Sequence, residues 1–416
     1  MGQQQKLTYH SVKLFTHILE FSMTKNTNDT TLVTAGRKKE WTHGIVNPPV
    51  YRASTCLFDT YAEMRERVAD PAGNKLFYGR KGTPTHWAFS DAMTELEGGA
   101  GTMLYPSGVA AVTGAILALV KAGDHVLITD SAYEPTRSFA NGFLKQMGIS
   151  TSYYDPKIGA NIKNLLKENT TVVVTETPGS LTFEVQDLPA ICEAARQHGA
   201  YVITDNTWAT PLLLNPLEVG ADISIHACTK YVGGHSDIML GSATANDRTF
   251  KKLQRTAFQL GHTVSPDDAF LALRGLRTLG VRLKQHEENA LKVAAWLQER
   301  PEVATILHPA FESCPGHDIW ARDFAGSSGL FSIVLKEGSY ADTAALVDDM
   351  KLFKMGFSWG GFESLILPSD PTTSRTAVKW EKTGPVIRLH IGLEDTDDLI
   401  SDMAAGLARY SAHLKA

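Results

Sequence analysis

The chain has 416 residues, an ordinary balance of apolar and charged residues, and a formal net charge of −5. Charges of one sign are not clustered, which argues against binding to nucleic acid, and the longest apolar run, 109–120, is too short to span a bilayer. We therefore expect a globular protein of two or three domains, with neither nucleic acid nor a membrane among its partners.

Cysteines are sparse, and their spacing bears on both location and metal binding. The chain has four, at positions 56, 192, 228 and 314, with no C-x-x-C pair among them. This pattern predicts reduced thiols in the cytoplasm and no metal site. Residues 1–22 contain a weakly apolar segment without a small-residue cleavage site, so we interpret them as an extension and not as a signal peptide.

The order of the predicted elements divides the chain into an arm and two domains. Residues 26–81 are rich in polar residues, Pro and Gly, and predict an extended arm. From 82 to 273, short Val- and Ile-rich runs alternate with amphipathic segments, as is typical of a mainly parallel, doubly wound sheet. The clearest predicted strands in this region are HVLIT (125–129), TTVVVTE (170–176), YVITD (201–205) and DISIHA (222–227).

The remainder of the chain predicts a smaller C-terminal domain. A long charged helical stretch starts around residue 272, and FSIVL (331–335) and VIRLHIG (386–392) follow as strands. The predicted boundaries are 1–82 for the extension and arm, 83–276 for an α/β domain, and 277–416 for an α+β domain.

Charged residues follow three of the predicted strands and the segment after a fourth. Asp130, Glu176 and Asp205 stand at strand ends, and Lys230 comes shortly after DISIHA. Ligands in open α/β sheets bind at the carboxyl ends of the strands, so we expect these side chains near one crevice. Taken alone, an acid and an amine such as Asp205 and Lys230 more often form an ordinary ion pair than a ligand site.

A turn at Ser107 and Gly108, before an Ala-rich helix, predicts an anion site that suits a phosphate. The dinucleotide and P-loop glycine patterns are missing from the sequence, which argues against those nucleotides. One phosphate site, a strand-end carboxylate and a strand-end lysine are what pyridoxal 5′-phosphate (PLP) requires. Tyr133 could stack on its ring, although a tyrosine in such a loop often only packs.

Several motifs, in this order along the chain, resemble the Cys/Met-metabolism family of PLP enzymes. They are YGRKGTPT, YPSGVAA, AYEP, TDNTWA, TKYVGGHSD, GSSGLFS, FSWGGFESL and RLHIGLED, and the similarity runs from about residue 30 to the C-terminus. The resemblance implies the PLP-dependent transferase fold of the aspartate aminotransferase type I class. That fold has a large domain with a mainly parallel seven-stranded sheet, a smaller C-terminal α+β domain and an extended N-terminal arm.

Carried over motif by motif, the resemblance assigns a role to each candidate site residue. Lys230 would form the Schiff base with PLP and move the Cα proton, Asp205 would pair with the pyridine nitrogen, and Tyr133 would stack on the ring. Phosphate binding falls to Ser107, Gly108, Val109 and Thr229, with Ser107 mainly shaping the turn, and to Tyr78 and Arg80 reaching across from a neighbouring subunit. Substrate binding falls to Arg388, which would hold the α-carboxylate, and to Ser358, Trp359 and Tyr78.

Two departures from the family pattern indicate which reaction the chain performs. ETPGSLTFEV lacks the asparagine found in many γ-synthases and γ-lyases, and Ala227 stands where a phosphate-binding serine is common. Both features resemble the β-lyase branch, which implies cleavage of L-cystathionine to L-homocysteine, pyruvate and ammonia in methionine biosynthesis. A deprotonated Tyr133 or the freed Lys230 would assist the incoming amine.

Further expectations concern substrates, assembly and rival functions. Cystine and other S-substituted cysteines are additional candidate substrates, and the resemblance implies a homotetramer of dimers that share active sites. The alternatives are a γ-type member of the family (cystathionine γ-synthase, an O-acyl-homoserine sulfhydrylase or methionine γ-lyase) and a non-catalytic PLP-binding regulator. The intact set of Lys230, Asp205 and Arg388 argues against the regulator.

Overall fold

The computed structural model describes residues 27–69 and 74–416. The interpretation of residues 1–22 as an extension therefore lies outside the described residues. Across the described part of the chain, no helix has both the length and the apolar character needed to cross a membrane. The same part contains no cluster of three or more His, Cys, Asp or Glu side chains that could hold a metal ion.

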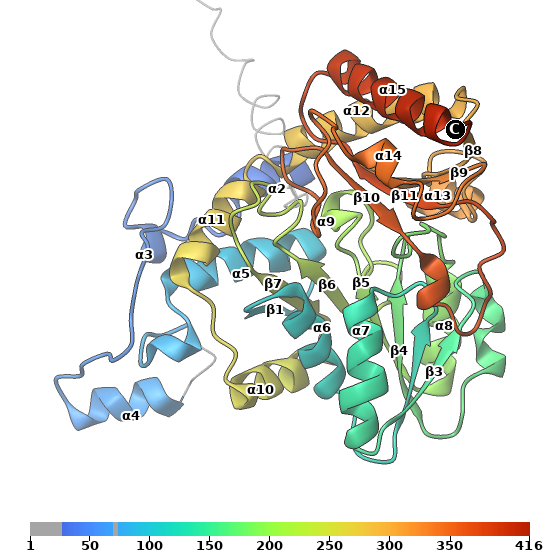
Figure 1. Cartoon of the computed structure of the whole chain (residues 1–416). Coiled ribbons are helices and arrows are strands. Elements are labelled where there is room, and N and C mark those ends of the chain that lie inside the picture. Colours follow the sequence, from blue (N-terminus) through green and yellow to red (C-terminus); the bar gives the residue numbers. More distant parts are fainter. Residues whose placement is uncertain (1–26, 70–73) are drawn as a thin grey trace, which may run out of the picture.

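A seven-stranded sheet forms the large domain, in the order β1-β7-β6-β5-β4-β2-β3 (Figure 1). Strands β2 to β6 pair in parallel, and β7 runs antiparallel to both β6 and β1. This confirms the predicted, mainly parallel seven-stranded sheet. The strands are β1 (Gly101–Tyr105), β2 (His125–Thr129), β3 (Ser150–Tyr154), β4 (Thr170–Glu176), β5 (Tyr201–Asp205), β6 (Ile223–Ala227) and β7 (Gly241–Ala245).

Helices cover both faces of this sheet, which explains why its central strands are apolar at successive positions. Leu127 and Val173 join the hydrophobic core on one face, whereas Val126 and Val172 join the core on the other. The first face packs against α5 (Pro84–Glu97), α8 (Leu188–His198) and α11 (Pro266–Leu276). The second packs against α6 (Gly108–Leu117), η2 (Ala140–Leu144), which follows α7 (Glu134–Phe139), and α10 (Phe250–Leu260).

The second domain contains a four-stranded antiparallel sheet in the order β10-β11-β9-β8. Its strands are β8 (Val303–Leu307), β9 (Leu330–Leu335), β10 (Leu365–Ser369) and β11 (Val386–His390). A separate hydrophobic core joins this sheet to α12 (Leu279–Gln298) and α15 (Thr396–His413), which lie side by side in Figure 1. Shorter elements are α13 (His317–Asp323), α14 (Ala344–Val347) and η4 (Pro371–Thr373).

The helical stretch predicted from about residue 272 is two helices and not one. Helix α11 ends at Leu276, and α12 begins at Leu279. Close packing accompanies the end of α11, because a Cβ on Gly275 would lie 2.3 Å from the carbonyl oxygen of Gly233.

The N-terminal arm is extended overall, yet it contains helices that its polar, aperiodic sequence did not predict. They are α2 (Asn28–Thr34), α3 (Lys39–Thr42) and α4 (Tyr61–Ala69), and Figure 1 shows α4 projecting away from the body of the molecule. Helix α4 has no buried residue, and Leu57 and Tyr61 are exposed. The remaining short elements before the second domain are η1 (Gly79–Lys81), η3 (Gly159–Asn164) and α9 (Thr210–Leu213).

Candidate active site

A cavity of about 310 Å³ lies where the two domains meet. Its lining combines strand-end residues of the large sheet, such as Asp205 and Lys230, with Trp359 and Arg388 of the second domain. Ten of the twelve residues predicted for the site line this cavity: Ser107, Gly108, Val109, Tyr133, Asp205, Thr229, Lys230, Ser358, Trp359 and Arg388. The structure therefore brings together residues that are spread over most of the sequence.

Lys230 lies three residues beyond β6, in a turn closed by its own backbone N–H and the carbonyl of Ala227 (3.0 Å). Its Nζ donates a hydrogen bond to Ser358 Oγ at 2.8 Å and lies 5.3 Å from the centre of the Trp359 ring. Burial and, to a smaller extent, Arg388 lower the pKa of the amine to about 8, although Asp205 partly opposes them. The Lys230 amine thus reaches its neutral, nucleophilic form at a lower pH than an ordinary lysine does.

Asp205 ends β5, next to β4, where it pairs in register with Glu176. Thr207 donates two hydrogen bonds to Oδ1, from its backbone N–H (3.0 Å) and its hydroxyl (2.5 Å). Among the described residues, Oδ2 receives none. Burial raises the pKa of Asp205, although the Thr207 hydrogen bonds and the nearby His226 and Lys230 lower it. The site thus holds a buried carboxylate that is only partly satisfied by the protein and faces the cavity.

The start of α6 forms one end of the cavity. Ser107 is the N-cap, and its hydroxyl accepts a hydrogen bond from the Ala110 N–H at 3.1 Å, so its side chain stabilises the start of the helix. A Cβ on Gly108 would lie 2.5 Å from Ala227 Cβ, so only glycine lets the helix start approach β6 this closely. The first backbone N–H groups of this ten-residue helix open onto the same cavity as Lys230.

Thr229 also lines the cavity, but its hydroxyl is already engaged by backbone groups. It accepts a hydrogen bond from the Leu240 N–H (3.1 Å), and it can donate to the Leu240 carbonyl (3.3 Å). These bonds tie the segment before Lys230 to the start of β7. A phosphate contact by Thr229 stays a prediction.

Tyr133 begins the turn into α7 and has its backbone fixed by a buried acid. Its N–H donates to Glu176 Oε2 at 2.7 Å. Burial raises the pKa of the Tyr133 phenol, and Glu176 raises it further, whereas Arg388 lowers it. The suggestion that a deprotonated Tyr133 assists the incoming amine is therefore disfavoured in this structure, and the neutral amine of Lys230 is the better candidate base.

Arg388 projects from the middle of β11 and is half-buried beside Tyr133. Within the described part of the chain, its Nη2 makes only long contacts of 3.4 Å, to the carbonyl oxygens of Gly356 and Ser358. Burial lowers the pKa of the guanidinium. A half-buried guanidinium whose contacts with protein are so weak can accept a carboxylate through its planar fork.

Tyr78 and Arg80 do not line this cavity. Arg80 donates a hydrogen bond to the carbonyl oxygen of Phe258 at 2.9 Å and borders a second cavity of about 450 Å³. Lys81 lies over the Phe258 ring in the same region. Within a single chain these residues are therefore separate from Lys230, and their predicted action on a neighbouring subunit stays a prediction.

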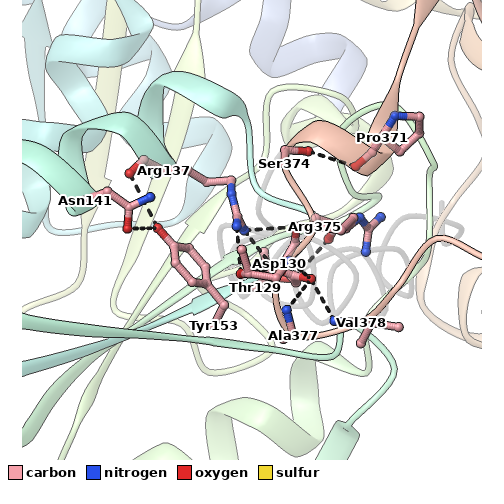
Figure 2. A network of polar contacts seen from close by, with 12 residues as sticks. Thr129, Asp130, Arg137, Asn141, Tyr153, Pro371, Ser374, Arg375, Ala377 and Val378 are labelled. Carbon is pink, nitrogen blue, oxygen red and sulfur yellow. Dashed lines mark hydrogen bonds and ion pairs between the residues drawn. The ribbon is translucent and has the colours of Figure 1, made fainter.

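Asp130 was expected near the same crevice, and this expectation is wrong. Figure 2 shows Asp130 enclosed by Arg137 and by the segment after η4. Arg137 Nη1 donates to Asp130 Oδ1 at 2.9 Å, and the N–H groups of residues 376–378 donate at 2.9–3.0 Å. Burial alone would raise the pKa of Asp130, but these hydrogen bonds outweigh it and lower the pKa. Asp130 thus connects the second domain to the sheet.

Two buried histidines next to the site were not among the residues predicted for it. His226, one residue before Ala227, contacts the carboxylate of Glu97 behind the sheet. His390 lies two residues after Arg388, hence on the same face of β11, and contacts the loop that bears Ser358 and Trp359. The sequence VIRLHIG did indicate that His390 could lie near the site, because a polar residue two positions after Arg388 falls on the same face of the strand. His235, by contrast, closes a local turn through Gly233 O (2.7 Å).

Comparison with known proteins places these features in context. The family described as "Cys/Met metabolism PLP-dependent enzyme" matches residues 29–408. Cystathionine beta-lyase MetC of Escherichia coli is 49% identical over 387 residues, covering 92% of this chain and 98% of that protein. Cystathionine beta-lyase of Salmonella typhimurium is 49% identical over 393 residues, covering 93% and 100%.

A solved structure agrees with the chain over a similar length. It is cystathionine gamma synthase from Xanthomonas oryzae pv. oryzae in complex with cystathionine, with a TM-score of 0.84 and 34% identity. The match covers 94% of this chain and all of that chain.

Proposed function

Because the chain belongs to the Cys/Met-metabolism family of PLP-dependent enzymes, we propose that it cleaves L-cystathionine to L-homocysteine, pyruvate and ammonia. This makes it a carbon–sulfur β-lyase of methionine biosynthesis. The observation that carries the proposal is the placement of the Lys230 amine in one cavity with Asp205 and Arg388. The 49% identity with two cystathionine beta-lyases, over nearly the whole chain, supports the choice of reaction.

PLP is the cofactor of this family, and the residues of the cavity fit it. Lys230 would hold it covalently, and Asp205 would face its ring nitrogen. Tyr133 would lie against the ring. The start of α6, with Ser107, Gly108 and Val109, would hold its phosphate together with Thr229. When bound, PLP supplies a protonated ring that accepts the electron pair left on the substrate Cα.

The chain's own residues provide proton transfer and substrate orientation. Lys230, with a pKa of about 8, can accept the Cα proton near neutral pH and then donate it to another atom of the substrate. Its hydrogen bond to Ser358 directs the amine toward the second domain. Asp205 would face the ring nitrogen. Burial raises its pKa, and the hydrogen bonds from Thr207 and, more weakly, the nearby His226 and Lys230 favour its ionised form.

Substrate recognition would depend on the loop after Gly356 and on β11. Arg388 binds the substrate α-carboxylate, and Ser358 and Trp359 line the same space. Phe357, although 92% exposed, also borders the cavity and would offer an apolar contact to the distal part of the substrate. Such a contact is compatible with cystine and other S-substituted cysteines as additional substrates.

The arm and the assembly complete the proposal. Tyr78 and Arg80 would act in a neighbouring subunit, where Arg80 contacts the phosphate and Tyr78 contacts cofactor and substrate. The assembly would be a cytoplasmic homotetramer built from dimers that share active sites, without a nucleic-acid or membrane partner. Arm (1–82), α/β domain (83–276) and C-terminal domain (277–416) are the units of this arrangement. The projecting, unburied α4 supports such a role for the arm.

The keto acid formed from cystathionine tests the proposal. β-Elimination releases pyruvate and homocysteine, whereas γ-elimination releases 2-oxobutyrate and cysteine. We expect the purified, PLP-loaded protein to give pyruvate as the main keto acid. A predominance of 2-oxobutyrate would assign the chain to γ-chemistry, and no turnover by a fully PLP-loaded protein would favour a regulator.

A further inference from the structure

His390 is a buried histidine at the end of β11 that holds a turn of the active-site loop. Only 1% of its surface is exposed. Its Nε2 is 3.1 Å from the Gly360 backbone nitrogen and 3.1 Å from the Gly361 carbonyl oxygen. One tautomer accepts from the Gly360 N–H, and the other donates to the Gly361 carbonyl. Both contacts use the same ring nitrogen, and Nδ1 has no hydrogen-bond partner among the described residues.

On its other side, the turn is pressed against the backbone that carries Lys230. Gly360 has a φ of +82°, and a Cβ there would lie 2.7 Å from the Tyr231 backbone nitrogen and 2.9 Å from the Lys230 carbonyl carbon. The turn is thus confined between His390 and the main chain of Lys230. A displacement of Gly360 in either direction would meet one of these two neighbours.

The residues just before this turn contact the amine of Lys230. Ser358 Oγ accepts the hydrogen bond from Lys230 Nζ, and the Trp359 ring lies 5.3 Å from the same nitrogen. Trp359 also packs against Tyr231, with ring centres 5.5 Å apart. The direction of the amine therefore depends on where the turn holds Ser358 and Trp359.

We propose that His390 is a positioning residue, which fixes the Gly360–Gly361 turn and through it sets Ser358 and Trp359 around the Lys230 amine. The inference rests on the proposed function, since it concerns how Lys230 is presented to PLP and substrate. His390 contacts neither directly. Its Nε2 acts by holding backbone groups, so the chemical requirement is a neutral acceptor or donor at that one position.

The surroundings of His390 favour the neutral ring that this role requires. Burial, with smaller contributions from His286, Arg388 and Lys230, lowers its pKa to about 3, although the hydrogen bond to Gly361 opposes them. The Tyr231 and His286 rings pack against it, with ring centres 5.9 and 5.2 Å away. A neutral imidazole keeps an acceptor available for Gly360, which a doubly protonated ring would lack.

Two amide substitutions separate positioning from mere packing. In H390Q the amide can reach the position of Nε2, whereas in H390N it reaches only that of Nδ1. The measurements are the pH midpoint of the visible absorbance of the PLP-loaded protein, kcat and KM for cystathionine, and thermal unfolding. H308L is the matched control, because His308 is equally buried but accepts a hydrogen bond from the Ala310 N–H (3.1 Å) and does not contact the turn.

We expect H390Q to keep the wild-type absorbance midpoint and to retain activity within about threefold. H390N should shift the midpoint and lower kcat by about tenfold, the size of one lost hydrogen bond, with a smaller change in KM. H308L should lower the unfolding temperature while leaving the midpoint unchanged. A wild-type midpoint in H390N, or equal midpoint shifts in H390N and H308L, would overturn the proposal.

Gly360→Ala tests the same turn from its other side and keeps His390 intact. Its methyl group would push against Tyr231 and Lys230, so we expect the absorbance shift of H390N to reappear. An unchanged midpoint in a folded G360A protein would contradict the proposal. The spectra do not depend on which substrate is cleaved, so a failure of the β-lyase assignment would appear in the keto acid and not in these midpoints.

Discussion

Asp130 and Asp205 end two strands of the same sheet, yet their surroundings give them opposite properties. Asp130 accepts hydrogen bonds from Arg137 and from three successive N–H groups of residues 376–378, and its pKa is lowered. Asp205 receives hydrogen bonds only from Thr207 among the described residues, all at Oδ1, and its pKa is raised. A satisfied carboxylate fixes the fold, and a partly satisfied one remains available for a ligand.

The same contrast extends to the basic partners of the two acids. Arg137 is buried and directs both ends of its guanidinium at Asp130 and Thr376. Among the described residues, the Nζ of Lys230, near Asp205, donates only to Ser358, and its pKa is lowered to about 8. The first region holds its charges in a closed network, and the second keeps an amine and a carboxylate apart within a cavity.

The strongest test of the open region is Lys230→Ala. We expect a loss of activity of at least about 10⁴-fold, because the amine both holds PLP and transfers the proton. The visible absorbance of the lysine-bound cofactor should disappear as well. Lys292→Ala, which removes an exposed pair with Asp397, is the control and should change neither property. Activity retained by the Lys230 variant would refute the assignment of this lysine.

Asp205→Asn tests the carboxylate of the same region. We expect kcat/KM to fall by about 10²–10³-fold, because the substitution removes a preorganised charge beside the ring nitrogen. The free energy of unfolding should change little or increase, since a buried and partly satisfied charge is removed. Steady-state kinetics and denaturant unfolding of the PLP-free protein measure the two effects. A large loss of stability with normal kinetics would mean that Asp205 stabilises the fold, as Asp130 does, and has no role in catalysis.

The sequence could predict the Asp205–Lys230 region because the rule that relates strand ends to ligand sites is local. It applied equally to Asp130 and failed there, because the backbone partners of Asp130 lie 246 or more residues later, in the irregular segment after η4. Helix α4 was missed for a related reason: it buries none of its residues, so no apolar periodicity marks it.

His390 shows a different limit of the sequence. Its position on the Arg388 face of β11 was readable, but its contact with Gly360 depends on the path of the loop after residue 356. The break between α11 and α12 likewise accompanies packing of Gly275 against the distant Gly233. Tertiary contacts of this kind leave no periodic pattern in the sequence.

Asp130→Asn tests the closed region, and its effect should fall on stability. The substitution leaves the Arg137 guanidinium buried without its counter-charge, so we expect a loss of about 3–5 kcal/mol in the free energy of unfolding. The kcat of the folded protein should stay within about threefold of wild type, because Asp130 does not line the cavity. Denaturant unfolding and kinetics at low temperature separate the two quantities.

Asp397→Asn is the matched control for this prediction, because Asp397 forms an exposed ion pair with Lys292 and should contribute less than about 1 kcal/mol. A second check replaces both partners, in Asp130→Leu with Arg137→Met. The double variant should recover part of the stability lost by Asp130→Asn, since no buried charge is then left unpaired. If Asp130→Asn lost activity but not stability, Asp130 would act in catalysis and not in the fold, and the proposed difference between the two regions would be wrong.

The smallest expected effect is a shift in the reactivity of Lys230 with pH. Burial disfavours the charged ammonium and Arg388 opposes it further, so the neutral amine accumulates as pH rises through about 8, not through the usual value near 10.5. In the PLP-free protein, labelling of Lys230 by trinitrobenzenesulfonate should therefore accelerate about tenfold between pH 7 and 9. Peptide mass analysis identifies the labelled lysine, and the exposed Lys292 provides the reference rate.

Substitutions of the two charged neighbours should move this midpoint in opposite directions. Asp205→Asn removes the charge that favours the ammonium, so the midpoint should fall, and Arg388→Leu removes a repelling charge, so it should rise. Asp130→Asn should leave the midpoint unchanged, because its charge is confined within the network of Arg137 and residues 376–378. A midpoint near 10.5 in the wild-type protein would mean that the cavity does not tune its lysine, and the physical distinction between the two strand ends would then rest on hydrogen bonding alone.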